Sequence, residues 1–291
     1  MKRYRSAKYE QRLRLSYDGL LQQWGVSTTE VDIPTSYGST HVHIFGKENA
    51  PPLVLFHGVA DDSALMWIYN AAGLAEQFSI YAVDTIGGPG KSTPSSNYNT
   101  SFDAAQWIDQ VLDGLKLHSV NMAGVSHGGY LVQYYTLCRN ERVNKGIALA
   151  STVPVTTAKE TMATMMKIFM PQALFPTSRN VRKLLAKLSG DNSAAFTDHP
   201  LITQHFELLL RGYNNVAMRY HQIIPFTAEQ IMQIKPKLLY LVGEQDPFAV
   251  RGGKKQLEQH GMNVIYFPEA GHGINHELPE KINRAIIDYL L

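Results

Sequence analysis

A pentapeptide of the form G-x-S-x-G, residues 124–128, constrains the fold of this chain more than any other sequence feature. The residues before it, 120–125, form an apolar run with the length of a buried strand, and residues 127–138 carry apolar side chains at helical spacing. A serine at a sharp strand-to-helix turn is strained and needs glycine neighbours, and the turn directs its hydroxyl out of the sheet. The pattern therefore predicts that Ser126 is a nucleophile.

Strands and helices are expected to alternate along most of the chain. Strands are predicted over residues 30–34, 40–45, 53–57, 79–84, 120–125, 143–150, 237–243 and 262–267. Helices are predicted over residues 7–24, 66–74, 102–115, 127–138 and 277–290. This alternation is typical of an α/β fold with a doubly wound sheet of eight mostly parallel strands. The first two strands are expected to pair through a turn at residues 36–39.

The alternation breaks from about Pro154 to Lys235, where only helical patterns occur, at 162–170, 181–188 and 205–220, and prolines punctuate them. We expect this segment to be a helical cap inserted above the sheet. The predicted organisation is therefore an N-terminal helical extension at 1–29, a core at 30–153 and 236–291, and a cap at 154–235.

An activated serine needs a base and an acid that orients the base. Asp246 follows the penultimate predicted strand and His272 follows the last one. Both positions lie at the carboxyl ends of strands, where open α/β sheets bind ligands, and the order Ser, Asp, His suits this type of turn. Glu244 is the nearest rival acid, and His276 is a weaker rival base because it precedes the final helix.

Two backbone N–H groups are expected to form an oxyanion hole. One belongs to His127, which follows the nucleophile, and the other to Val59, in the loop after the strand that ends at His57. Gly58 would let the backbone approach the substrate closely. The imidazoles of His57 and His127 are expected to pack or form hydrogen bonds and not to transfer protons.

Together, His57-Gly58, the pentapeptide, Asp246 and Gly271-His272 resemble the α/β-hydrolase superfamily from about residue 30 to the C-terminus. Within that superfamily, residues 40–42, 50–55, 81–87 and 124–129 resemble the bacterial single-domain carboxylesterases of the naproxen-esterase (carboxylesterase NP) type. The resemblance implies hydrolysis of carboxylic esters through an acyl-enzyme on Ser126. It also implies a helical cap between the sixth and seventh strands and no cofactor.

The substrate is expected to be a small, largely apolar ester. We expect His57, Gly58 and the cap residues Met162, Met166 and Phe169 to line its binding site, because the cap is rich in Met and Phe. The same stripe at helical spacing also fits an ordinary apolar core.

Other activities of the superfamily stay open at this stage. A serine nucleophile argues against dehalogenases and epoxide hydrolases, which need an aspartate. Carbon–carbon bond hydrolases of the meta-cleavage-product type, lactonases, thioesterases and perhydrolases remain alternatives. A ligand-binding receptor that retains the triad is the alternative that is not an enzyme.

Residues 87–92 read Gly-Gly-Pro-Gly-Lys-Ser and invite comparison with a nucleotide-binding P-loop. A P-loop needs glycine where this chain has Thr85 and a helix after Ser92, where Pro94 follows instead. A loop beside the cleft is therefore predicted.

His41 and His43 share a strand face. Without a third ligand nearby, we expect no metal and a solvated face.

Composition excludes several classes of partner. The net charge of +2 gives no indication of nucleic-acid binding. No run reaches the ~20 apolar residues of a membrane span, and the basic start lacks the apolar segment of a secretory signal. A single cysteine, Cys138, excludes an internal disulfide, fits a cytoplasmic location and is expected to be buried. The sequence is compatible with either a monomer or a homodimer.

Overall fold

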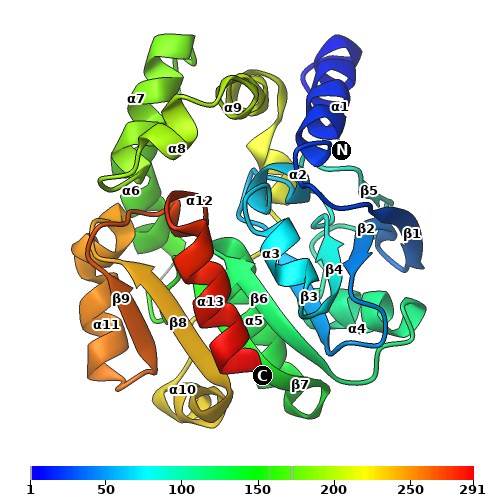
Figure 1. Cartoon of the computed structure of the whole chain (residues 1–291), viewed down its shortest axis with the longest axis vertical. Coiled ribbons are helices and arrows are strands. Elements are labelled where there is room, and N and C mark those ends of the chain that lie inside the picture. Colours follow the sequence, from blue (N-terminus) through cyan, green and yellow to red (C-terminus); the bar gives the residue numbers. More distant parts are fainter. Residues whose placement is uncertain (1, 157, 171, 173) are drawn as a thin grey trace.

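The computed structural model describes residues 2–156, 158–170, 172 and 174–291. A nine-stranded sheet lies at its centre with helices against both faces (Figure 1). Eight strands follow the order β1-β2-β4-β3-β6-β7-β8-β9, and the short β5 pairs with β2. Antiparallel pairing is confined to β1, β2, β4 and β5 at one edge, and the remaining pairs are parallel. The strands are β1 (Thr29–Thr35), β2 (Gly38–Gly46), β3 (Pro52–Phe56), β4 (Ser79–Val83), β5 (Thr93–Pro94), β6 (Val120–Val125), β7 (Val143–Leu149), β8 (Leu238–Gly243) and β9 (Val264–Phe267).

The α-helices differ widely in length, and none among the described residues is both long and apolar enough to cross a membrane. They are α1 (Ala7–Leu21), α2 (Ser63–Met66), α3 (Ala71–Ala75), α4 (Ala104–Gly114), α5 (His127–Cys138), α6 (Ala158–Phe169), α7 (Ser178–Leu188), α8 (Ala194–Thr197), α9 (Pro200–Gly212), α10 (Ala228–Ile234), α11 (Lys254–Gln259), α12 (Ile274–Glu277) and α13 (Pro279–Leu290).

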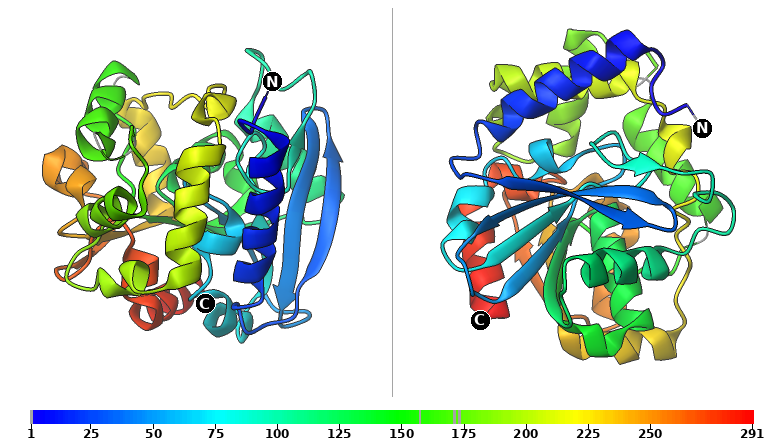
Figure 2. Two further views of the ribbon diagram at one scale, coloured as in Figure 1. Left: turned by 90° about the horizontal axis from the view of Figure 1, so that it is seen from above. Right: turned by 90° about the vertical axis from the view of Figure 1, so that its right-hand side faces the viewer.

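The central strands are apolar on both faces because both faces are covered. Along β3, Leu53 and Leu55 enter one hydrophobic cluster, and Val54 and Phe56 enter the other. Helices α3 and α13 cover the first face, and α4 and α5 cover the second (Figures 1 and 2). The predicted doubly wound sheet is therefore confirmed, with β5 as an additional two-residue strand.

Between β7 and β8 the described residues form helices, turns and one isolated bridge at Tyr213. Helices α6 to α9 lie beyond one end of the sheet, and α1 runs beside α9 (Figures 1 and 2). The N-terminal segment is hydrogen-bonded to the chain after α9. The N–H of Arg5 donates to the carbonyl of Gly212, and the N–H of Asn214 donates to the carbonyl of Arg3, both at 2.8 Å. The N-terminal extension and the helical insertion thus support each other.

Three predicted helices were wrong in extent. The predicted helix 66–74 is two short helices, α2 and α3, with the buried Asn70 between them donating to the side chain of Asn283. Helix α9 begins earlier than the helix predicted over 205–220, because Pro200 occupies its first turn and His199 caps it. The C-terminal helix is divided by the non-helical Leu278, after which α13 begins at Pro279.

Two predictions about burial were also wrong. His41 and His43 do not lie on a solvated face: their exposed fractions are 6% and 0%. Helix α1 covers this face, and the rings of Tyr17 and Trp24 pack against His43. Cys138, at the end of α5, is half-buried and not fully buried.

Gly124 provides a test of the strand-to-helix turn. A β-carbon there would lie 2.3 Å from the backbone carbonyl of Gly128, which cannot move without disturbing α5. We predict that Gly124→Ala lowers the free energy of unfolding by about 1–3 kcal/mol or more, measured by urea denaturation. The control is Gly19→Ala on α1, where a β-carbon would meet no atom within 4 Å beyond the backbone of its own helix, and stability should rise by about 0.5–1 kcal/mol. Equal effects of both changes would contradict this account.

Candidate active site

Ser126 lies at a sharp turn between a strand and a helix. Strand β6 ends at Val125, α5 begins at His127, and Ser126 between them has φ 54° and ψ −113°. Its N–H donates to the carbonyl of Leu149 at 2.8 Å, and its carbonyl accepts from the N–H of Tyr130 at 3.1 Å. Such a backbone costs of order 1–3 kcal/mol in a residue with a side chain and persists only where its surroundings impose it.

The glycine at the end of the pentapeptide permits the close contact that holds this turn. A β-carbon on Gly128 would lie 2.3 Å from the carbonyl oxygen of Phe56 and 2.8 Å from that of His57. The start of α5 therefore packs directly on the end of β3. This contact brings the loop after β3 beside Ser126, and a β-carbon on Gly58 would lie 3.7 Å from that of Ser126.

Asp246 and His272, from the loops after β8 and β9, form a direct hydrogen bond. His272 Nδ1 lies 2.8 Å from Asp246 Oδ2. The carboxylate is 1% exposed, and its other oxygen accepts the N–H of Phe248 at 2.8 Å. Because the ionised carboxylate can only accept, Nδ1 carries the proton, and in the neutral ring Nε2 keeps its lone pair. This is the tautomer that a general base needs.

The charge of Asp246 also tunes His272. Burial by itself lowers the pKa of the imidazole, but the charge and hydrogen bond of Asp246, with a further contribution from Glu277, outweigh burial. The net result is a pKa raised above its ordinary value of 6.5. A stabilised imidazolium is what a base that accepts a proton in the transition state requires.

The rival residues are engaged elsewhere. The carboxylate of Glu244 forms an ion pair with Lys254. His276 is buried in α12, its Nε2–H donates to the carbonyl of Leu65 at 2.9 Å, and burial lowers its pKa to about 4. The geometry therefore favours Asp246 and His272 over both rivals.

Glu277 is a site residue that sequence reasoning missed. One of its carboxylate oxygens accepts the N–H of Gly271 at 3.0 Å, and the other accepts the N–H of Gly190 at 2.7 Å. The N–H of His272 donates to the carbonyl of Leu188 at 2.6 Å. The loop that carries His272 is thus fastened to the segment after α7. In the sequence, Glu277 looked only like the start of the final helix.

The two expected oxyanion donors belong to the start of α5 and to the loop after β3. His127 is the first residue of α5, so its N–H has no acceptor within the helix. Val59 is exposed in the loop after β3. The His57 ring holds this loop, because Nδ1–H donates to the carbonyl of Gly58 at 2.7 Å and Nε2 accepts the N–H of Thr85 at 2.9 Å.

The His127 imidazole is fully enclosed, as expected for a residue that packs. Burial, with smaller contributions from His221 and His57, holds the pKa of His127 well below its ordinary value. The ring is therefore neutral near pH 7. Its half-buried neighbour His221 has a pKa lowered to about 4 by desolvation and donates Nε2–H to the carbonyl of Ile86 at 2.8 Å.

The expected cap residues differ in their surroundings. Met166 is half exposed, and Phe169 packs against a small apolar cluster formed with α7. Phe248 packs against the same cluster, and its ring centroid lies 4.9 Å from that of His272. The side chain of Met162 lies outside the described residues.

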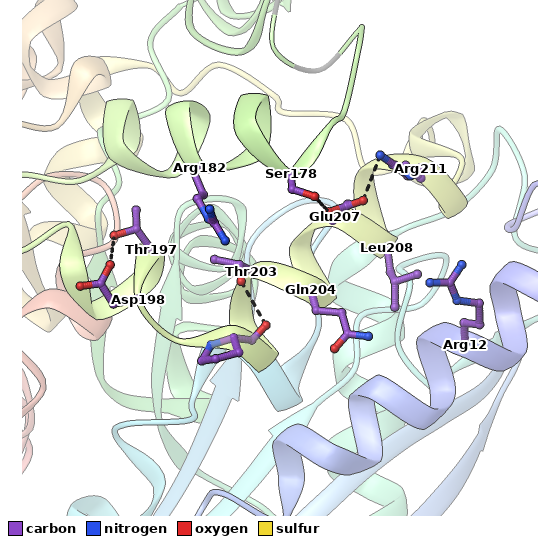
Figure 3. Close-up of a pocket in the computed structure, with 11 residues that line it drawn as sticks. Arg12, Ser178, Arg182, Thr197, Asp198, Thr203, Gln204, Glu207, Leu208 and Arg211 are labelled. Carbon is purple, nitrogen blue, oxygen red and sulfur yellow. Dashed lines mark hydrogen bonds and ion pairs between the residues drawn. The ribbon is translucent and has the colours of Figure 1, made fainter.

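A separate cavity of about 320 Å³ lies among α1, α7, α8 and α9 (Figure 3). None of Ser126, Asp246 and His272 lines it. Its walls are mostly polar and charged, unlike the pocket expected for an apolar ester. The lining residues are Arg12, Ser178, Arg182, Thr197, Asp198, Pro200, Thr203, Gln204, Glu207, Leu208 and Arg211.

The glycine-rich loop at residues 87–92 does not form a phosphate cradle. The guanidinium of Arg3 donates to the carbonyls of Gly88, Gly90 and Ser92. The N–H of Lys91 donates to the carboxylate of Asp84 at 2.6 Å, so this amide of the loop already has an anionic acceptor within the chain. The predicted loop is confirmed.

Comparisons with known proteins agree with this architecture. A family model described as α/β hydrolase fold matches residues 51–210, more than half of the chain. The chain belongs to the α/β hydrolase family. It is 30% identical over 286 residues to a Bacillus subtilis protein named uncharacterized carboxylesterase nap, covering 94% of this chain and 90% of the relative.

Two further relatives come from the same organism. Carboxylesterase YbfK of Bacillus subtilis is 26% identical over 284 residues, covering 94% of this chain and 92% of that protein. The crystal structure of naproxen esterase (carboxylesterase NP) from Bacillus subtilis superposes with a TM-score of 0.84 at 25% identity, covering 98% of this chain and 99% of that one. The similarity to this type of carboxylesterase extends over nearly the whole chain, including the segment between β7 and β8.

Asp246 and Glu244 are neighbouring carboxylates, so substituting each in turn tests which of them orients His272. We predict that Asp246→Asn leaves the fold intact and lowers hydrolase activity about 10⁴-fold, because the imidazole loses the partner that fixes its tautomer. Glu244→Gln, which removes only the pairing with Lys254, should retain near wild-type activity. Steady-state kinetics and circular dichroism of both variants check this. The opposite pattern would transfer the acid role to Glu244.

Proposed function

We propose that this chain is a serine carboxylesterase that cleaves small, largely apolar esters. The observation that carries the proposal is the hydrogen bond between Asp246 and His272, at the carboxyl ends of β8 and β9. Ser126 follows the carboxyl end of β6 in the same sheet. The names of the relatives, carboxylesterase and naproxen esterase, support the same reaction class.

In the proposed mechanism, His272 Nε2 takes the proton of the Ser126 hydroxyl as the oxygen attacks the ester carbonyl. The resulting imidazolium is stabilised by Asp246 and then protonates the departing alcohol. An acyl group remains on Ser126. Water, deprotonated by His272, attacks this acyl-enzyme, and collapse of the second tetrahedral intermediate returns the serine and releases the acid. These steps need no cofactor.

The tetrahedral oxyanion is proposed to accept hydrogen bonds from the N–H groups of Val59 and His127. Each such donor is worth roughly 3 kcal/mol in comparable enzymes. The hydrogen bonds of the His57 ring to Gly58 and Thr85 support a loop fixed before substrate arrives. We therefore assign His57 a positioning role, and Gly58 the role of allowing close approach.

We propose that residues 154–235 act as a cap that shapes the substrate pocket. Its attachment to the catalytic loop, through Leu188 to His272 and through Gly190 to Glu277, supports this role. Phe169 and Met166 are our candidates for contacts with the apolar part of the substrate. A cytoplasmic location stays part of the proposal and rests on the single cysteine.

The pH profile of activity tests His272 as the base. Since its pKa is raised above 6.5, kcat/KM should fall as the pH decreases through that raised value and the ring becomes protonated. The charge of Glu277 contributes to the increase, so Glu277→Gln should lower the pKa and move the acid limb to lower pH. A loss of kcat/KM that is equal at every pH would indicate a purely structural role for Glu277.

The nucleophile is tested by steady-state hydrolysis of p-nitrophenyl acetate, butyrate and octanoate. We predict multiple turnover by the wild type, a preference among chain lengths that sizes the pocket, and a loss of about 10⁶-fold in kcat for Ser126→Ala. Ser119→Ala, an exposed serine before the same strand, serves as the control. A folded wild type with no turnover on any ester would refute the carboxylesterase proposal.

A further inference from the structure

The hairpin of β1 and β2 places four ionisable side chains on one face. In the antiparallel register, Glu30 stands opposite His43, and Asp32 stands opposite His41. Directly opposed residues point to the same side of a sheet, and so do residues two apart on one strand. Two carboxylates and two imidazoles therefore converge, and the ligand that the sequence pattern lacked comes from the neighbouring strand.

The spacing of these groups suits a small cation. One donor atom from each of Glu30, His41 and His43 lies within 4.8 Å of the other two. His41 Nε2 is 3.0 Å from Glu30 Oε2, and the two imidazole centroids are 4.9 Å apart. Tetrahedral Zn²⁺ with bonds of about 2.0–2.1 Å holds its donors roughly 3.4 Å apart. His41 Nε2 and Glu30 Oε2 already lie close to that separation.

The other nitrogens of both histidines are already held, as in known metal sites. His41 Nδ1 lies 2.9 Å from Asp32 Oδ1. His43 Nε2 lies 2.6 Å from the Tyr17 hydroxyl, which donates to Asp84 at 2.9 Å. A metal-binding histidine usually donates its second N–H to such a group, which fixes its orientation.

These contacts leave one nitrogen of each ring available. When His41 donates through Nδ1 and His43 through Nε2, the opposite nitrogens keep their lone pairs. His43 Nδ1 is buried without a hydrogen-bond partner among the described residues, and His41 Nε2 makes no well-directed hydrogen bond, although Glu30 Oε2 lies 3.0 Å from it. A buried nitrogen lone pair without a donor is costly, and a bound cation removes that cost.

We propose that Glu30, His41 and His43 form a Zn²⁺ site on the β1–β2 hairpin, with water as the fourth ligand. Imidazole and carboxylate are common ligands of this ion. Both histidines are enclosed, whereas the side chain of Glu30 is 40% exposed and provides the route of entry. The site would fasten the edge hairpin, against which α1 packs.

Lys91 competes with the ion. Its Nζ lies 2.8 Å from Glu30 Oε2 and 2.8 Å from Asp18 Oδ1. Zinc binding would draw Glu30 away and leave the ammonium paired with Asp18. Removing the ammonium should therefore strengthen metal binding, an outcome that an ordinary hydrogen-bond network would not produce.

The test titrates the chelator-treated, metal-free full chain with ZnCl₂ in a calorimeter and with CoCl₂ in a visible spectrophotometer. We expect a single Zn²⁺ per chain and the visible absorption of four-coordinate Co²⁺. Glu30→Gln should weaken zinc binding at least 100-fold, and Asp32→Asn about 10- to 100-fold. Lys91→Gln should bind more tightly than the wild type. His118→Gln, at an exposed histidine, should have no effect.

Glu30 and Asp32 are partly exposed, so these variants should fold even where substitution of His43 prevents folding, and circular dichroism verifies this. The proposal is overturned if the wild type binds no zinc. It is equally overturned if Glu30→Gln binds zinc as tightly as the wild type, or if Lys91→Gln binds it no more tightly.

Discussion

The left-handed backbone of Ser126 is the constraint on which the rest of the site depends. A turn this sharp is possible because Gly124 and Gly128 have no side chains where strand, helix and the end of β3 meet. The cost of the strained conformation is offset by the burial of β6 and α5 on both sides. As a result, the Ser126 hydroxyl lies at the carboxyl edge of the sheet, where strands β3, β8 and β9 also end.

The position of His272, the proposed base, also depends on the segment inserted between β7 and β8. His272 is oriented from one side by Asp246 and from the other by its backbone hydrogen bond to Leu188. Glu277 accepts N–H groups from both segments and is buried, so its carboxylate holds them together. Movement of the segment after α7 would therefore disturb the loop that carries the base. The segment between β7 and β8 and the candidate catalytic residues are therefore parts of one hydrogen-bonded unit.

Local patterns were enough to predict the strands other than the two-residue β5, together with the turn at Ser126 and the order of the three candidate catalytic residues. A buried strand can be recognised in the sequence as a short apolar run. Residues that follow parallel strands lie together at one edge of the sheet, so their proximity can be predicted from the strands alone. Features that depend on contacts between distant segments were missed. Glu277 acts on backbone from elsewhere in the chain, and the burial of His43 comes from α1. The predicted helices are interrupted where side chains such as Asn70 form hydrogen bonds with residues that are distant in the sequence.

The central claim is that Ser126 is the one activated nucleophile. Its most direct test is intact-mass spectrometry after treatment with a fluorophosphonate, followed by peptide mapping. The account predicts a single adduct on Ser126, formed quickly by the wild type and slowly by Asp246→Asn, with none on Ser126→Ala. An adduct on another residue, or ester hydrolysis that continues while Ser126 stays unlabelled, would contradict the account.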